Sequence, residues 1–469
     1  MRHFGFFVMA TGLILLVGTV SARAEDAAGD WTGQLPSGFV VRLHIDRATD
    51  GFSGAFINAS GNRTQLDKVT SDGAGLHFQI DNSNLSYDGI WAEDRSAWQG
   101  TLVLQGNYPL SLHRATAVEL GPKVRRRPQE TAIEAGPRPY SEHNVNFENS
   151  SAKVNLAGTL TLPQGKGPFP AVVLVSGTGP NTRDEEAEGH KVFTVLADAL
   201  ARRGIAVLRY DKRGVGESTG SYVGTTTIEF ASDARAAIAF LKAQPGINSN
   251  YVGILGHSEG GIIAPMVGVD VPDIAFVVIL GGPSIRGDKL FLAQSEKVSS
   301  LYGVPKDYIM RRKAFDRKLY EAVMSAGSDE EATTKAREII TQGVLDKVVD
   351  ANEAPTLTRD TTTAWERFFL AYDPAPTLRQ LSMPVLAVYG SLDSQVPAEA
   401  NLPVAREALK NNKSATVIEL PGLNHLLQQA TTGSPQEYAD IDETMSLLAL
   451  NTVVDWIVES ENANKNKAH

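Results

Sequence analysis

One short stretch, Gly256-His257-Ser258-Glu259-Gly260-Gly261, has the residue types and spacing of a nucleophilic serine site. An apolar run (252–255) precedes it, and a run of small and apolar residues (262–267) follows. This predicts a strand, a sharp turn and a helix, the context in which a G-x-S-x-G serine is held exposed on a strained backbone. The flanking glycines leave room for that turn. Because a serine hydroxyl is a poor nucleophile at neutral pH, the stretch predicts a nearby base and an acid that orients the base.

The base and the acid follow from their order along the chain. Only His425 and His469 lie beyond Ser258, and His469 ends a polar tail (462–469) that we expect to be disordered. In proteins that use this turn, the acid and then the histidine follow the serine. Asp393 comes just after an apolar run that ends at residue 390. The sequence therefore predicts Ser258 as nucleophile, His425 as base and Asp393 as the orienting acid, a set that cleaves acyl bonds.

Alternating strands and helices must position these residues. Continuous apolar runs at 171–175, 205–208 and 275–280 are typical of strands buried on both faces of a parallel sheet. Helical patterns separate these runs, so we expect crossover connections and a hydrolase domain that spans residues 141–461.

Between the central strands and the acid-bearing strand, the pattern changes. Residues 285–373 are charged, helical and without a strand signal, which predicts an inserted helical cap. An aromatic cluster near its end either lines a substrate pocket or packs the cap on the core: Trp365, Phe368, Phe369 and Tyr372.

The N-terminal part of the chain has a different character. Residues 26–115 show period-2 alternation broken by turn signals, which predicts a small all-β domain closed as a barrel or sandwich. A linker rich in proline and arginine (116–140) follows, and we expect it to be semi-extended. Residues 1–24 have the apolar run and the small residues before Glu25 that mark a signal peptide, so the mature protein is expected to be exported, periplasmic or secreted, after cleavage near Ala24.

With these motifs, residues 140–460 resemble the α/β-hydrolase superfamily and, within it, the bacterial serine-aminopeptidase-like carboxylesterases. The resemblance is carried by four segments: Ser176-Gly177-Thr178-Gly179-Pro180, Asp211-Lys212-Arg213-Gly214-Val215-Gly216-Glu217-Ser218, the serine stretch above and Tyr372-Asp373-Pro374. It implies a mostly parallel sheet flanked by helices and the same three catalytic roles. It also implies an oxyanion hole formed by the main-chain amides of Thr178 and Glu259. The Glu259 carboxylate, at the start of the expected helix, is expected to interact with the helix dipole, and the alternative is that it disfavours anionic substrates. Many relatives have His-Gly where this chain has Ser176-Gly177.

The resemblance implies cleavage of small-molecule carboxylic esters with short to medium acyl chains through an acyl-enzyme. Two alternatives stay open. A serine aminopeptidase needs an acidic site for the substrate amine, for which Glu186, Glu188 and the acidic residues of the cap are candidates. A ligand-binding protein would rely on the β-domain. The chain has no cysteine, phosphate loop or metal-ligand cluster, so no cofactor or metal is expected. A net charge of −10 argues against a nucleic-acid partner. After signal cleavage, no stable membrane insertion is expected.

Overall fold

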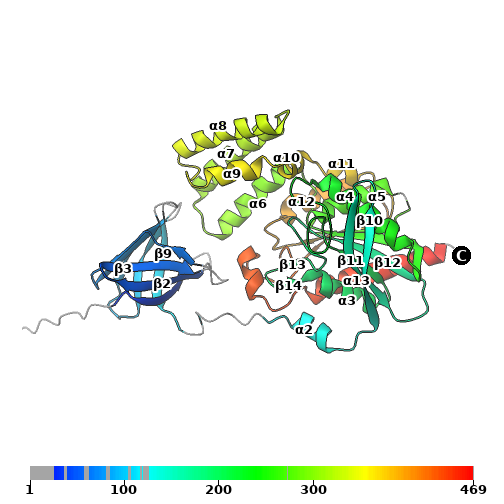
Figure 1. Cartoon of the computed structure of the whole chain (residues 1–469), viewed down its shortest axis with the longest axis horizontal. Coiled ribbons are helices and arrows are strands. Elements are labelled where there is room, and N and C mark those ends of the chain that lie inside the picture. Colours follow the sequence, from blue (N-terminus) through cyan, green and yellow to red (C-terminus); the bar gives the residue numbers. More distant parts are fainter. Residues whose placement is uncertain are drawn as a thin grey trace, which may run out of the picture.

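The computed structural model describes residues 26–35, 40–57, 63–80, 85–103, 107–116, 119, 126–271 and 273–467 (Figure 1). The predicted signal peptide, residues 1–24, lies outside these residues.

The N-terminal domain is an antiparallel barrel. Its strands are β1 (Gly29–Gln34), β2 (Val40–Ala48), β3 (Gly51–Ile57), β4 (Arg63–Gln65), β5 (Lys68–Ser71), β6 (Gly75–Ile80), β7 (Leu85–Trp91), β8 (Ala97–Val103) and β9 (Asn107–Arg114). They follow the order β2-β1-β9-β8-β7-β6-β5-β3-β4, and an additional β2–β3 pairing closes the ring. Alternate side chains point inward, so that Trp31, Phe78 and Trp98 are fully buried. The Tyr87 hydroxyl at the centre of this core donates to the Trp98 carbonyl at 2.9 Å.

The predicted linker contains a helix, α2 (Pro128–Ala135), which belongs to the hydrolase domain. Pro128 supplies the fixed φ that suits the first helical turn. Ile133 is buried in the same cluster as helix α3 (Val192–Arg202), and the Gln129 carboxamide accepts a hydrogen bond from the Thr444 amide at 2.6 Å. The prediction of a semi-extended linker was therefore wrong for this part, because Ile133 gives the helix an apolar contact with the domain.

The hydrolase domain is built on one eight-stranded sheet in the order β10-β11-β15-β12-β16-β17-β18-β19. Its strands are β10 (Tyr140–Asn149), β11 (Val154–Pro163), β12 (Phe169–Val175), β15 (Ala206–Tyr210), β16 (Ile247–His257), β17 (Val277–Leu280), β18 (Val385–Gly390) and β19 (Ala415–Leu420). The pairs β10–β11 and β11–β15 are antiparallel and form one edge of the sheet. The remaining neighbours, from β15 through β12, β16, β17 and β18 to β19, all pair in parallel. The carboxyl ends of the parallel strands consequently meet at one edge of the sheet.

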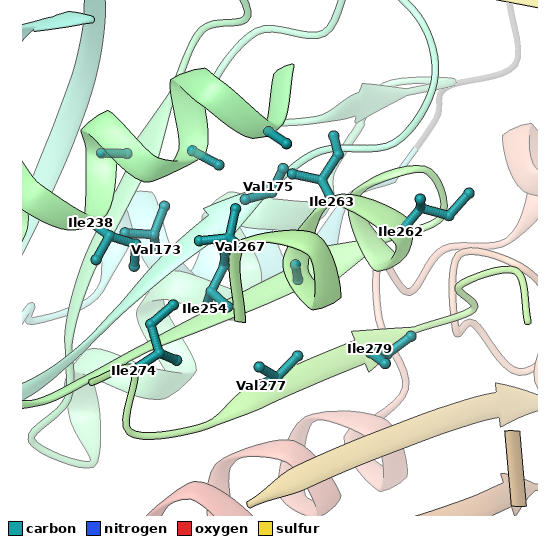
Figure 2. Packing of buried hydrophobic residues seen from close by; sticks show 14 of the residues in the cluster. Val173, Val175, Ile238, Ile254, Ile262, Ile263, Val267, Ile274, Val277 and Ile279 are labelled. Carbon is teal, nitrogen blue, oxygen red and sulfur yellow. The ribbon is translucent and has the colours of Figure 1, made fainter. Parts of the chain in front are cut away.

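Helices cover both faces of this sheet. On one face, α4 (Thr227–Lys242) and α5 (Gly260–Asp270) pack on side chains such as Val173 and Ile254 (Figure 2), and α12 (Ala398–Leu409) packs on β18 and β19. On the other face, α3 and α13 (Leu447–Lys467) pack on Val172 and Leu174. Successive side chains of β12 thus point to opposite faces of the sheet and are buried in two different cores, which explains why this strand is apolar throughout.

A helical cap lies between β17 and β18, where the sequence predicts it (Figure 1). It consists of α6 (Gly287–Leu301), α7 (Lys306–Met324), α8 (Asp329–Leu345), α9 (Ala354–Thr361) and α10 (Ala364–Ala371), and the short α11 (Ala375–Leu378) leads back to the sheet. The cap has its own small core, which includes the fully buried Leu319, Val323 and Leu370.

The C-terminal helix is longer than expected. The sequence predicts a disordered tail from residue 462, but α13 continues to Lys467, so that prediction was wrong for residues 462–467. An ion pair between Lys465 and Glu461, one helical turn apart at 2.7 Å, stabilises this last part of the helix. Residues 468–469 lie outside the described residues.

Candidate active site

The serine stretch forms a tight turn between β16 and α5. Ser258 has a positive φ of 54°, a strained conformation for a residue with a side chain. A Cβ on Gly256 would lie 1.8 Å from the Gly260 carbonyl oxygen, and a Cβ on Gly260 would lie 2.0 Å from that of Val175. Glycine is therefore required at both positions. The Ser258 amide is held by the Leu280 carbonyl at 2.9 Å, which fixes the turn against β17.

The structure brings Asp393 and His425 together next to this turn. Asp393 lies just past β18 and is fully buried, and its Oδ2 is 2.8 Å from Nδ1 of His425. The other oxygen, Oδ1, accepts the amides of Gln395 and Val396, each at 2.8 Å. Both oxygens of this carboxylate are thus hydrogen-bonded, so the carboxylate is fixed in orientation and suited to hold the Nδ1 edge of the histidine ring.

Ser258 and His425 line the same cavity, which has a volume of about 300 Å³. Its walls come from the loops after β12, β16, β18 and β19 and from the cap helices α6 and α10, and they are mostly apolar. Phe291, Trp365 and Leu426 are among the apolar members, and Gln294 and Gln395 are polar. A half-enclosed cavity of this size with a few polar groups is typical of a small-molecule site.

Only two residues of the predicted aromatic cluster line this cavity. Trp365 and Phe369 are stacked with ring centres 4.8 Å apart and face it. Phe368 and Tyr372 form a second stack at 5.4 Å, and Phe368 faces a different surface hollow beside Val323 and Met324. Their assignment to the substrate pocket was wrong, since neither ring lines this cavity, and Tyr372 lies past the end of α10, where the backbone is extended.

The two predicted oxyanion donors lie at the start of α5 and in the loop after β12. The Thr178 amide is in a loop that lines the cavity, and Glu259 follows Ser258 directly. In this loop the Gly177 amide is already used, since it donates to Glu185 Oε1 at 2.5 Å. The Glu259 side chain, in contrast to the expectation, is fully enclosed and hydrogen-bonded to Lys212, Thr227 and Trp365.

Glu185 was not predicted from the sequence, and neither was the role of His257. Glu185 has a positive φ of 46° and is buried beside the cavity. Its Oε1 lies 3.0 Å from Nδ1 of His257, whose Nε2 lies 2.9 Å from the main-chain oxygen of His425. Burial alone lowers the pKa of His257, but the Glu185 charge and these hydrogen bonds outweigh it, so the pKa lies above its usual range. The signal in the sequence that could have indicated this role is the position of His257 directly before the predicted nucleophile.

The sheet order, the serine turn and the acid–histidine pair at neighbouring strand ends define an α/β hydrolase. A family model described as "Serine aminopeptidase, S33" matches residues 186–429, more than half of the chain. The chain therefore belongs to this family of hydrolases.

Relatives with known names include esterases. Esterase EstD of Thermotoga maritima is 29% identical over 322 residues, which cover 67% of this chain and 68% of that protein. The solved esterase Pf2001 of Pyrococcus furiosus is 15% identical, with 68% of this chain and 91% of that chain covered and a TM-score of 0.41. Est1E of Butyrivibrio proteoclasticus, solved with ferulic acid, is 16% identical, with 69% and 100% covered and a TM-score of 0.39.

None of the helices in the described ranges is long and apolar enough to cross a membrane. Within the same ranges, no group of three or more His, Asp or Glu side chains is arranged to hold a metal ion.

Proposed function

We propose that this protein is a serine carboxylesterase that cleaves small carboxylic esters with short to medium acyl chains. The observation that carries the proposal is that His425, hydrogen-bonded to Asp393 at 2.8 Å, lines the same cavity as Ser258, which sits on a strained turn. A serine needs such a base and such an orienting acid to attack an acyl carbon.

In the proposed reaction, His425 removes the proton of Ser258 as the hydroxyl oxygen attacks the ester carbonyl. Asp393 keeps the ring in the tautomer whose Nε2 is free to accept that proton, and it stabilises the imidazolium that forms. The amides of Thr178 and Glu259 would donate to the developing oxyanion, and losing one such donor typically costs about 100- to 1000-fold in rate. The alcohol leaves with the proton from His425, and water then cleaves the acyl-enzyme by the same route.

The size and lining of the cavity support an ester substrate with a short to medium acyl chain. About 300 Å³ lies at the lower limit of ligand pockets, and the stacked pair Trp365 and Phe369 gives it an apolar wall. An apolar wall suits an alkyl or aryl acyl group and contributes binding through the area it buries.

The test is hydrolysis of p-nitrophenyl esters of increasing acyl length by wild type, Ser258→Ala, His425→Ala and, as a matched control, Ser300→Ala on the exposed side of α6. We expect turnover that peaks at one chain length, is lost in the first two variants and is unchanged in Ser300→Ala. Turnover that survives Ser258→Ala would contradict the proposal.

Aminopeptidase activity is the second candidate, since Glu186 lines the cavity with an exposed side chain and offers a carboxylate to a substrate amine. Amino-acid p-nitroanilides test it: turnover that requires both Ser258 and Glu186 favours the peptidase. Turnover of esters alone favours the esterase.

We further propose that the protein is exported and that residues 1–24 are removed. Sequencing the N-terminus of protein recovered from the periplasm or the medium tests this, and we expect it to start near Glu25. An intact Met1 would contradict it.

A further inference from the structure

The main-chain carbonyl of Gly177 is held by two side chains. Lys212 Nζ donates to this oxygen at 2.6 Å, and Asn181 Nδ2 donates to it at 2.8 Å. Lys212 is 4% exposed and comes from the loop after β15. A buried ammonium group aimed at a carbonyl oxygen beside the candidate nucleophile calls for a reason beyond turn formation, because desolvating the charge is costly.

The contact controls the direction of the Thr178 amide. The carbonyl of residue 177 and the N–H of residue 178 belong to one planar peptide unit and point in opposite directions when the bond is trans. The bond is trans here, since the one cis bond among the described residues is Gly167–Pro168. Two donors that fix the Gly177 oxygen therefore fix the Thr178 N–H. A cation on that oxygen also polarises the peptide and makes its N–H a stronger donor.

The same lysine is tied to the second oxyanion donor. Glu259 Oε2 pairs with Lys212 Nζ at 3.0 Å, and the Glu259 side chain is fully buried. The other oxygen, Oε1, accepts Trp365 Nε1 at 2.6 Å. A continuous set of contacts thus runs from the cap helix α10 through Glu259 and Lys212 to the loop after β12.

We propose that Lys212 is a positioning residue of the oxyanion hole. Its ammonium group orients and polarises the Gly177–Thr178 peptide, and through Glu259 it links that peptide to Trp365 in the cap. This inference rests on the proposed function, in which Thr178 and Glu259 supply the two amides.

The first variant is Lys212→Met, which keeps the length of the side chain and removes its charge. We expect kcat on a p-nitrophenyl ester to fall about 100-fold, the loss typical of one oxyanion donor, while KM changes less than about threefold. A trifluoromethyl ketone forms a tetrahedral oxyanion on a reactive serine, so its affinity should fall in proportion to kcat/KM.

A second variant separates positioning from folding, since Lys212→Met leaves Glu259 buried without its cation. Lys212→Met with Glu259→Gln removes that unpaired charge and should return the melting temperature toward the wild-type value. The proposal requires that kcat and ketone affinity stay low in this double variant.

The matched control is Arg213→Met. Arg213 is the neighbouring residue, equally buried and paired with Asp233 at 2.6 Å. We expect the Arg213→Met variant to be less stable than wild type but to keep the wild-type kcat and ketone affinity. The reason is that the Arg213 side chain contacts α4 and not the Gly177 peptide.

Two results would overturn the positioning role: wild-type kcat in Lys212→Met, or recovery of kcat together with the melting temperature in the double variant. Both results leave the esterase proposal intact as long as Ser258→Ala is inactive. Turnover that survives Ser258→Ala removes the esterase proposal itself, so the two failures are distinguishable.

Discussion

His257 lies between two groups that can only accept hydrogen bonds. Its Nδ1 is 3.0 Å from Glu185 Oε1, and its Nε2 is 2.9 Å from the main-chain oxygen of His425. A neutral imidazole carries one N–H and can satisfy only one of these acceptors, whereas an imidazolium satisfies both. The pKa of His257 is raised above its usual range, which also favours the imidazolium form. We therefore predict that His257 is a buried cation paired with Glu185.

Glu185→Gln tests this prediction, because it keeps the shape of the side chain and removes the charge. The carboxylate Oε1 serves two donors, the His257 ring and the Gly177 amide. Hydrogen bonds to a charged group contribute about 1.5–3 kcal/mol each, and a carboxamide oxygen keeps part of that, so we expect a loss of about 3 kcal/mol at pH 6.

The loss should depend on pH with a definite sign. His257 has a higher pKa in the folded than in the unfolded protein, so its contribution to stability is fully present below about pH 6.5. It is lost as the pH rises through the raised folded-state pKa. The difference in stability between wild type and Glu185→Gln should consequently be largest near pH 6 and smaller near pH 9.

Melting temperatures of both proteins at the two pH values give the difference, and the ¹³Cε1 signal of His257, assigned with His257→Gln, gives the charge of the ring. Glu186→Gln is the control: its neighbouring carboxylate is exposed, so we expect no pH-dependent difference. An equal loss at pH 6 and pH 9, together with a neutral ring at pH 6, would refute the reasoning.

Three further predictions concern the cap, the cavity and the serine turn. Burial, with the Asp360 charge adding to it, raises the pKa of Glu366 to about 8, so stability falls as the pH rises toward that value. Glu366→Gln should therefore melt increasingly above wild type from pH 5 to pH 8; a constant gap would contradict this. Phe369→Ala removes a ring that lines the cavity, and we expect preference for longer acyl chains and a loss of about 3–5 kcal/mol; unchanged chain-length preference would contradict it. Gly256→Ala should prevent soluble expression, since its Cβ would lie 1.8 Å from the Gly260 oxygen, whereas Gly327→Ala, at 3.4 Å from Glu331, should express normally.

The parts of the site set by local backbone demands could be predicted from the sequence. The turn around Ser258 requires glycine where the chain has Gly256 and Gly260, so the motif and the geometry coincide. Asp393 and His425 follow strand ends, and parallel strands bring such ends to one edge of the sheet. The all-β domain and the cap were predictable for a similar reason, because periodicity and composition change where they begin.

The parts that depend on long-range contacts could not be predicted. Glu185 lies 72 residues before His257, and Lys212 lies 47 residues before Glu259, so nothing in the spacing pairs them. Helix α2 was missed because a proline-rich segment favours an extended chain, whereas burial of Ile133 favours a helix. The two aromatic stacks at α10 could not be separated from the sequence either, because positions 365, 368, 369 and 372 have the i, i+3, i+4, i+7 spacing of one helix face.

The charged contacts around Gly177 explain how the loops after β12, β15 and β16 adopt one arrangement relative to one another. Its N–H is bound by Glu185, which pairs with His257, and its carbonyl is bound by Lys212, which pairs with Glu259. Buried ion pairs add little net stability, but breaking one by removing a partner costs about 3–5 kcal/mol. Other arrangements of these loops would leave a buried charge unpaired and are disfavoured by that amount. The pairs therefore select the orientation of the Gly177–Thr178 peptide more than they stabilise the fold, which is why single substitutions should be costly and neutral double substitutions tolerated.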